Sequence, residues 1–368
     1  MRACTRVPQA AIPAALGVLA ALVAPAACTA PDRPAGRAPE LPRAARDFLA
    51  PDSARGLRLG EGVFYHFAWS ARGPWAVHLV SADLARCELG LQVVPALEDD
   101  GTTRTRRTVT DMVPRELGRP LAGVNGDFFI LQGGAPVGPE VTAGTRRFAL
   151  RPAVAWGASR VPWIGDPVRV EDRGPEVNRM GFGPDTVGLE GRDDDVAPAG
   201  LQVIGGYPVL LDGGVHMGDL GVAGNPSFAA ARHPRTAVGF DGGGKLFWLV
   251  VVDGRQPPRS AGMSLPELAD LVIALGAEDA LNLDGGGSSA MSLRGRIVNR
   301  PSDARGERTV ANSLWLVRDR RGCGGLLRGA RERTAALVSP VPPQRQPDVA
   351  TAARPRLEIP PTEGVHHD

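Results

Sequence analysis

The sequence has one lysine, Lys245, although lysine and arginine together number 42 among its 368 residues. It has no Walker motif, no His-Glu-x-x-His metal site and no nucleophile elbow, which excludes the common nucleotide, zinc-protease and serine-hydrolase machinery. The histidines show no metal-ligand spacing. Acid–base chemistry would therefore depend mainly on aspartate, and anion binding on arginine and glycine backbone.

A strong net charge is also missing, because the formal charge is only +2. The arginines are scattered along the chain, and the nearest approach to a basic patch, Arg104, Arg106 and Arg107, is typical of a solvated loop. A nucleic-acid partner is therefore not expected.

The N-terminal apolar run, Ala10 to Ala27, is interrupted by Pro13 and Pro25. It is short for a membrane span, which takes about 20 apolar residues. Since Arg2 and Arg6 precede it and small residues end it, residues 1–27 are interpreted as a secretory signal peptide.

Ala26-Ala27-Cys28 also resembles the end of a bacterial lipobox, with Cys28 as the lipid-modified residue. Pro25 departs from the aliphatic residue usual at that place, so cleavage by the ordinary signal peptidase near Ala24 stays open. The protein is expected to be exported, either as a lipoprotein of the bacterial cell envelope tethered through Cys28 or as a secreted protein.

Composition divides the rest of the chain into three parts. Residues 28–56 and 326–368 are rich in proline and arginine and lack periodicity, so a disordered tether and a disordered tail are predicted. Residues 57–325 are long enough for one β-rich domain. Two cysteines remain there, Cys87 and Cys323, and a disulfide between them is slightly favoured over two free thiols in an oxidising compartment.

Strand-like segments dominate this domain. Gly62–Ser70, Pro74–Ala82 and Leu89–Pro95 are predicted to form an antiparallel meander, and Thr236–Phe240 with Leu246–Val252 a central, buried hairpin. Few helices are expected, so the predicted class is α+β, with β-rich mixed sheets.

The clearest helix is Ser264–Leu275, which has a capping box at its start and Gly276 after its end. It leads into Ala280–Met291, where an apolar run ends in an aspartate, three glycines and two serines. Glycine backbone with serine hydroxyls could bind an anion, or the segment could be a plain turn. Asp241–Gly244 repeats the Asp-Gly-Gly-Gly sequence inside the hairpin, so the flanking residues must distinguish the two.

Five polar sites stand at strand ends or in glycine-rich loops, where a rigid sheet can bring charges together. They are Asn125 with Asp127, Arg235 with Thr236, Asp253 with Arg255, Asn282 with Asp284, and Asn299 to Asp303. In this order, the surrounding motifs resemble the phosphodiester glycosidase family. The motifs are Val124–Phe129, Pro234–Gly239, Val250–Arg255, Ser264–Gly276, Ala280–Met291, Val298–Asp303, Glu307-Arg308 and Ala311-Asn312.

The resemblance implies hydrolysis of the glycosidic bond of a sugar 1-phosphodiester, such as an N-acetylglucosamine 1-phosphodiester, with release of free sugar. It implies that the acid, base or nucleophile are two among Asp127, Asp284 and Asp303. Many bacterial members have glycine where Asp127 stands. The implied substrate-binding residues are Asn125, Arg235, Asn282, Gly285, Gly286, Gly287, Ser288, Ser289, Asn299 and Arg308.

Two other functions fit the same loops. One is a non-catalytic envelope protein that binds anionic glycans. The other is a metal-dependent phosphodiesterase, in which aspartate and asparagine oxygens would hold Ca²⁺ or Mg²⁺.

Overall fold

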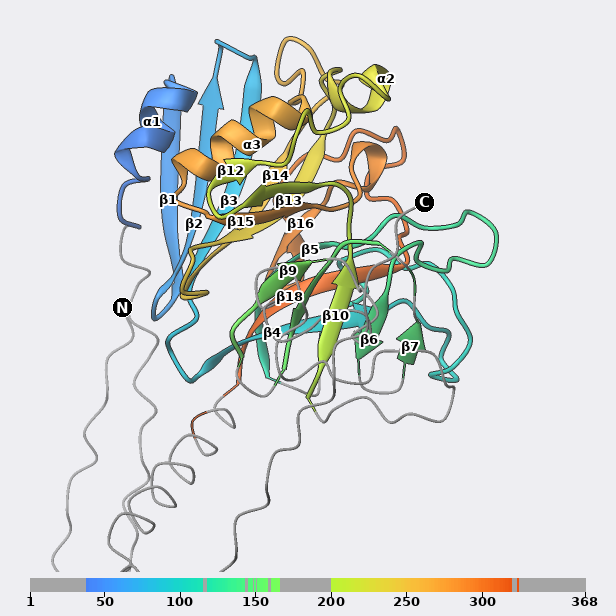
Figure 1. Cartoon of the computed structure of the whole chain (residues 1–368). Helices are drawn as coiled ribbons and strands as arrows, with labels where there is room; N and C mark the ends of the chain where they lie inside the picture. Colours follow the sequence, from blue (N-terminus) through green and yellow to red (C-terminus); the bar gives the residue numbers. More distant parts are fainter. Residues whose placement is uncertain are drawn as a thin grey trace, which may run out of the picture.

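Strands make up most of the fold in the computed structural model, and they form three sheets (Figure 1). The structure describes residues 38–114, 118–142, 145–147, 149, 151–157, 160–165, 200–319 and 323. The predicted signal peptide, Cys28 and the tail 326–368 lie outside these residues. The α+β, β-rich class is confirmed, but the described sheets are not mixed, because their strands pair antiparallel throughout.

The largest sheet has eight strands. Their order is β1 (Ser53–Gly60), β2 (Val63–Ser70), β3 (Trp75–Asp83), β14 (Leu246–Val252), β13 (Arg235–Phe240), β15 (Asp279–Asn282), β11 (Val209–Asp212) and β12 (Val215–His216). The predicted hairpin is β13–β14, and Asp241–Gly244 is the turn inside it. Strand β14 is buried on both faces because its alternate side chains enter two different cores.

Helices cover one face of this sheet. Helix α1 (Arg43–Leu49) and helix α3 (Leu265–Ala274) pack there, and α2 (Pro226–Ala229) lies near them at one end (Figure 1). The predicted capping box of α3 is present: Glu267 N donates to Ser264 Oγ, and Ser264 N donates to the Glu267 carboxylate.

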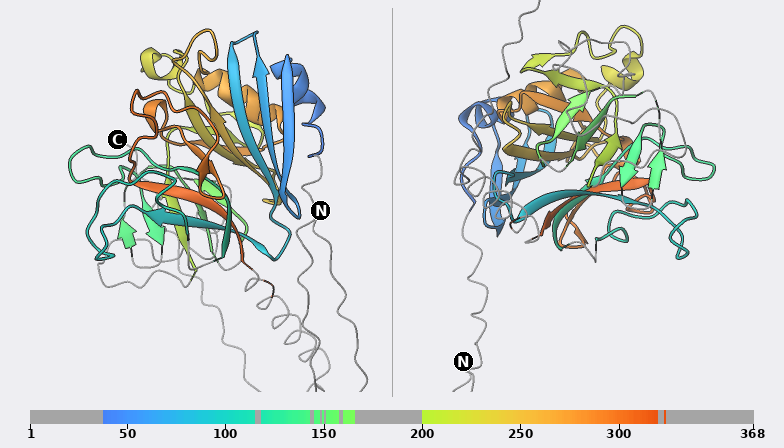
Figure 2. Two further views of the ribbon diagram at one scale, coloured as in Figure 1. Left: turned by 180° about the vertical axis from the view of Figure 1, so that it is seen from behind. Right: turned by 60° about the horizontal axis from the view of Figure 1, so that its bottom comes forward.

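The opposite face packs on a five-stranded sheet, and the two views of Figure 2 show the sheets stacked. Its order is β17 (Arg296–Ile297), β16 (Met291–Leu293), β5 (Arg119–Asn125), β18 (Asn312–Arg318) and β4 (Leu89–Pro95). The third sheet has the order β7 (Thr145–Arg147), β6 (Glu140–Thr142), β10 (Gln202–Gly205), β8 (Ala153–Trp156) and β9 (Trp163–Gly165). The predicted meander holds for β2 and β3, but β4 pairs with β18 in the other sheet.

The predicted tether, residues 28–56, is too long at its C-terminal end. Residues 43–49 form α1, and β1 begins at Ser53 as the edge strand of the large sheet. Leu41, Ala45 and Leu49 recur every four residues and are buried against α3 and the sheet. Their burial shows that the folded region starts before residue 57, although the surrounding proline and arginine are typical of a linker.

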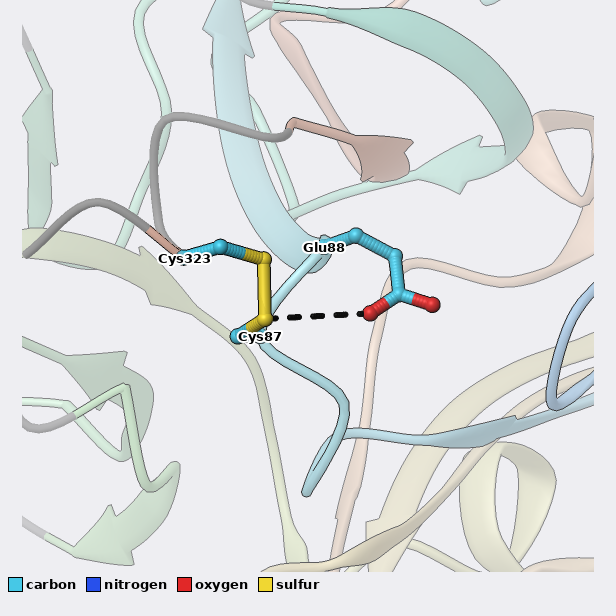
Figure 3. A group of neighbouring side chains, drawn as sticks. All are labelled: Cys87, Glu88 and Cys323. Atoms are coloured by element: carbon cyan, nitrogen blue, oxygen red, sulfur yellow. Dashed lines mark hydrogen bonds between the residues drawn. A yellow bond between two sulfur atoms is a disulfide. The ribbon is translucent and has the colours of Figure 1, made fainter. Parts of the chain in front are cut away.

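Cys87 and Cys323 form a disulfide, which Figure 3 shows beside Glu88. The bond joins the segment after β18 to the connection between β3 and β4, 236 positions away in sequence. Within the part of the chain that the structure describes, no helix is long and apolar enough to cross a membrane.

Candidate active site

The candidate site lies where the C-terminal ends of β5 and β15 meet. Asp127 follows β5 and Asp284 follows β15, and Asp284 N donates a 2.9 Å hydrogen bond to the Gly126 carbonyl. Asn125 braces this junction, because its Nδ2 donates to the Asp284 carbonyl (2.6 Å) and its Oδ1 accepts from Thr236 Oγ1 and Ala290 N. The sheets thus bring together two of the predicted aspartates, and Asn125 positions them.

The Asp127 carboxyl is buried, with 1% of the residue exposed. Its Oδ2 accepts a 2.5 Å hydrogen bond from Gly138 N, and its Oδ1 has no partner among the described residues. Burial raises the pKa of Asp127 to about 7, and the neighbouring Asp284 carboxylate acts in the same direction. Asp127 can therefore hold a proton near neutral pH.

Asp284 is less enclosed than Asp127. Burial raises the pKa of Asp284 to about 6, while hydrogen bonds from the Ser288 hydroxyl and from Gly285 N and the charge of Arg308 oppose the increase. The Gly285 N–H donates to Asp284 Oδ1 at 2.9 Å. Of the two carboxyls, Asp284 is the one more readily ionised.

Asp303, the third predicted catalytic residue, is held in an ion pair. Arg308 Nε and Nη2 donate to its two carboxylate oxygens at 2.7 and 2.9 Å. This bidentate pair lies against Gly287, where any Cβ would clash with it. Arg308 Nη1 also reaches Ser288 Oγ at 3.4 Å. Asp303 thus orients Arg308 beside the loop, which favours a positioning role over an acid–base role.

The glycine loop is a short 3₁₀ turn, Gly286–Ser288. Most of its amides have partners: Gly285 N donates to Asp284 Oδ1, Gly286 N to the Pro234 carbonyl, and the amides of Ser288 and Ser289 donate within the turn. The loop is therefore a poor anion-binding nest. The glycines instead let neighbouring chains approach closely, since a Cβ at Gly285 would lie 2.8 Å from the Pro234 carbonyl oxygen.

Arg235, predicted to bind phosphate, is buried with 1% exposed. Its Nε donates to the Met263 carbonyl, and its Nη2 donates to the carbonyls of Phe228 and Ala231. Burial lowers its pKa to about 10, and the charge of Arg255 adds to the decrease. Most of the N–H donors of Arg235 thus hold α2 and the segment before α3 in place.

Two predicted asparagines have mainly structural contacts. Asn282 Nδ2 donates to the Tyr207 carbonyl (2.6 Å), although its buried Oδ1 has no partner in the described region. Asn299 accepts from Met291 N and donates to the Ser289 carbonyl and to Asp253 Oδ1. Asn299 thereby fixes the end of the glycine loop. Ser289 Oγ is buried without a partner among the described residues.

Arg255, which belongs to one of the five polar sites, lies beside the glycine loop. Its guanidinium is exposed, lies next to Gly286 and donates to His233 Nδ1 at 3.3 Å. Among the described residues it has no carboxylate partner. Of the arginines beside the glycine loop, Arg255 is therefore the most available to an anion.

A buried polar chain behind Asp127 was missed because its members are far apart in sequence. Asp127 N donates to Asn312 Oδ1, Asn312 Nδ2 donates to Glu140, and Glu140 pairs with Arg104 at 2.5 Å. Glu140 is fully buried. This chain fixes the backbone that carries Asp127.

Among the described residues, the one group of three histidine, cysteine or acidic ligands that could hold a metal ion consists of Cys87, Glu88 and Cys323, and its cysteines are joined in the disulfide (Figure 3). The candidate site has two carboxyls with raised pKa values at adjacent strand ends and arginines beside them, a set of groups suited to acid–base hydrolysis.

Comparison with known proteins agrees with this class. A family model for phosphodiester glycosidases matches residues 119–317, more than half of the chain. The chain belongs to the phosphodiester glycosidase family.

Curated relatives match over shorter segments. N-acetylglucosamine-1-phosphodiester alpha-N-acetylglucosaminidase of Bos taurus is 44% identical over 69 residues, which are 19% of this chain and 12% of that enzyme. The SPbeta prophage-derived uncharacterized protein YomE of Bacillus subtilis is 39% identical over 85 residues, 23% of this chain and 13% of that protein. The matched segments thus span only a small part of the relatives' own length.

Two solved structures share the fold. A hypothetical protein from Synechocystis has a TM-score of 0.52 and 18% identity, covering 72% of this chain and 63% of the other. The zebrafish N-acetylglucosamine-1-phosphodiester alpha-N-acetylglucosaminidase catalytic domain, auto-inhibited by its pro-peptide, has a TM-score of 0.52 and 19% identity, covering 72% and 84%.

Proposed function

We propose that this protein hydrolyses the glycosidic bond of a sugar 1-phosphodiester of the N-acetylglucosamine 1-phosphodiester type and releases free sugar. The single observation that carries the proposal is the pair formed by Asp127 and Asp284, whose pKa values are raised to about 7 and about 6 at adjacent strand ends. Most glycosidases need one protonated and one ionised carboxyl across the sugar ring, and this pair provides both near neutral pH.

Asp127 is the proposed general acid, because its carboxyl is the more buried and has the higher pKa. It would protonate the phosphate oxygen as the bond from that oxygen to the anomeric carbon breaks. A phosphomonoester leaving group has a second pKa of about 6, so a donor with a pKa near 7 is well matched to it. The phosphate stays on its former partner.

Asp284 is the proposed ionised carboxylate. It would either activate a water molecule toward the anomeric carbon or attack that carbon itself. The hydrogen bonds from Gly285 N and Ser288 favour its charged form. The configuration of the sugar first released distinguishes the two routes, because inversion indicates direct attack by water.

Arg255 and Arg308 are proposed to bind the phosphate. They lie on the glycine loop beside Asp284, near Gly286 and Gly287, and the Asp303 carboxylate neutralises only Arg308. Guanidinium groups suit a phosphodiester because their planar donors can engage two oxygens at once. Arg255→Ala is expected to raise KM more than it lowers kcat.

The test uses p-nitrophenyl N-acetylglucosaminyl phosphate in ¹⁸O-labelled water. Hydrolysis of the glycosidic bond yields free sugar that carries the label and unlabelled nitrophenyl phosphate. Asp284→Asn and Asp127→Asn should each lower kcat by at least about a hundredfold while the protein stays folded, the size typical of lost acid–base catalysis. Label in the phosphate would instead show attack at phosphorus and refute the proposal.

Two controls address the other functions. Binding of sugar phosphodiesters without turnover would favour a glycan-binding protein of the envelope. Loss of activity in EDTA, with recovery on adding Ca²⁺ or Mg²⁺, would favour a metal-dependent phosphodiesterase; the proposed mechanism predicts unchanged rates in EDTA.

Export to the cell envelope is part of the proposal. A disulfide between Cys87 and Cys323 fits an oxidising compartment, and the sequence before residue 28 has the features of a signal peptide. Lipid attachment at Cys28 predicts membrane-associated protein in cell fractions and its release by Cys28→Ala. Equal release of both forms would indicate a secreted protein.

A further inference from the structure

Three aromatic side chains pack against one another next to the segments that carry the two carboxyls. Phe128 follows Asp127, Tyr207 lies between β10 and β11, and Phe228 lies on α2. The centroid of the Phe228 ring lies 6.1 Å from that of the Phe128 ring, in an edge-to-face arrangement. It lies 6.4 Å from that of the Tyr207 ring, in a stacked arrangement. Tyr207 is 44% exposed. We call Phe128, Tyr207 and Phe228 the aromatic platform.

The aromatic platform is fixed to the segment that leads to Asp284. Tyr207 N donates to the Asn282 carbonyl (2.8 Å), and Asn282 Nδ2 donates to the Tyr207 carbonyl (2.6 Å). These two bonds fix the Tyr207 backbone to Asn282, which lies two residues before Asp284 in the chain. Gly206 makes the approach possible, since a Cβ there would lie 2.6 Å from the Asn282 carbonyl oxygen.

The segments that carry the aromatic platform also adjoin Asp127. Phe128 is the next residue in the chain, and Gly205, two residues before Tyr207, lies against the Asp127 carboxylate.

Arg151 adds a positive charge to the aromatic platform, over the Tyr207 ring. Its guanidinium carbon lies 5.5 Å from the centroid of the Tyr207 ring, and its charge lowers the pKa of Asp127. Among the described residues Arg151 has no carboxylate partner. An exposed ring next to a cation that has no carboxylate partner in the described part of the chain is suited to a ligand with an apolar face and an anionic substituent.

We propose that the aromatic platform, together with Arg151, is the subsite that binds the pyranose ring of the sugar 1-phosphodiester. This inference rests on the proposed function and adds the residues that select a sugar. One face of a pyranose consists of C–H groups, which pack on aromatic rings, while the ring hydroxyls remain free for polar partners. Stacking there places the anomeric carbon near Asp127 and Asp284.

The experiment measures binding without turnover, in the full-length chain carrying Asp284→Asn. N-acetylglucosamine and inorganic phosphate are titrated separately by calorimetry. Adding Tyr207→Ala should weaken N-acetylglucosamine binding by about tenfold, which corresponds to about 1.4 kcal/mol and is the upper range for an aromatic contact. Phosphate affinity should stay unchanged. Tyr207→Phe keeps the ring and should bind the sugar as the parent does.

Val215→Ala is the matched control, because Val215 is an exposed apolar residue (66%) on β12, outside the aromatic platform. It should change neither affinity. Parent-like sugar binding by Tyr207→Ala, a parallel loss of sugar and phosphate binding, or no sugar binding by the parent would each overturn the inference. If sugar binding depends on Tyr207 but the wild-type protein hydrolyses no phosphodiester, the aromatic platform stands and only the proposed reaction fails.

Discussion

The pH profile of kcat/KM should be a bell whose acidic limb depends on Ser288. Activity requires ionised Asp284 and protonated Asp127, whose pKa values are about 6 and about 7. At about pH 6.5, about six-tenths of the enzyme has both groups in the required state. The fraction falls about twentyfold by about pH 8.5, and equally far by about pH 4.5. The two limbs report the pair as a coupled unit.

Ser288 controls the acidic limb because its hydroxyl donates a hydrogen bond to the ionised Asp284 carboxylate and lowers its pKa. A hydrogen bond to a charged group contributes about 1.5 kcal/mol or more, which is about one pH unit. Ser288→Ala should therefore raise the Asp284 pKa and move the acidic limb upward by about one unit. At about pH 5.5 the variant should be about eightfold slower, with the alkaline limb unmoved.

Ser289→Ala is the matched control for this prediction. Ser289 is also buried, but its Oγ has no hydrogen-bond partner in the described region. Initial rates at low substrate from about pH 4 to about pH 9 would locate both limbs in each variant. An acidic limb that stays in place in Ser288→Ala, or that moves as far in Ser289→Ala, would refute the assignment of that limb to Asp284.

Two predictions concern stability. The pKa of Asp127 is higher in the folded state, so burial of this carboxyl lowers stability as pH rises from about 4 to about 7. Asp127→Asn should therefore raise the free energy of unfolding by up to about 4 kcal/mol at about pH 8 and by much less at about pH 4. Urea titrations at both pH values check this, and an equal gain at each would contradict it. Leu49→Ala, at a fully buried position on α1, should cost about 2–5 kcal/mol, whereas Asp47→Ala on the exposed side of α1 should stay within about 0.5 kcal/mol. Equal, small effects of the two changes would show that α1 is not part of the domain.

Local patterns predicted the strongest elements of the fold. The capping box at Ser264 and the doubly buried strand Leu246–Val252 are both present, because each is determined by neighbouring residues. The partner of Leu89–Pro95 is strand β18, more than 200 residues later, and no local signal specifies such pairing. Helix α1 was missed because its buried residues stand among prolines and arginines whose composition is typical of linkers.

The sequence motifs named segments that the fold brings together, but they did not indicate the contacts that each residue makes. The motifs contain Asn125, Asn299 and Arg235, whose side chains are hydrogen-bonded to other groups of the protein. The motifs could not show this, because the type of a residue does not tell which way its donors point. The pair of Asp127 and Asp284 could be separated from Asp303 only by burial and by the Arg308 ion pair.

The high pKa of Asp127 arises from glycines on two other segments. A Cβ at Gly138 or at Gly205 would lie within 2.8 Å of Asp127 Oδ2, so the absence of side chains lets both backbones close over the carboxyl. One of them donates the Gly138 N–H to Oδ2, which by itself favours ionisation, but burial outweighs it and the pKa rises. Gly138, in the loop before β6, and Gly205, the last residue of β10, thus allow the carboxyl to be buried, and burial raises its pKa. The proton donor of the proposed reaction is therefore defined by tertiary packing as much as by the aspartate itself.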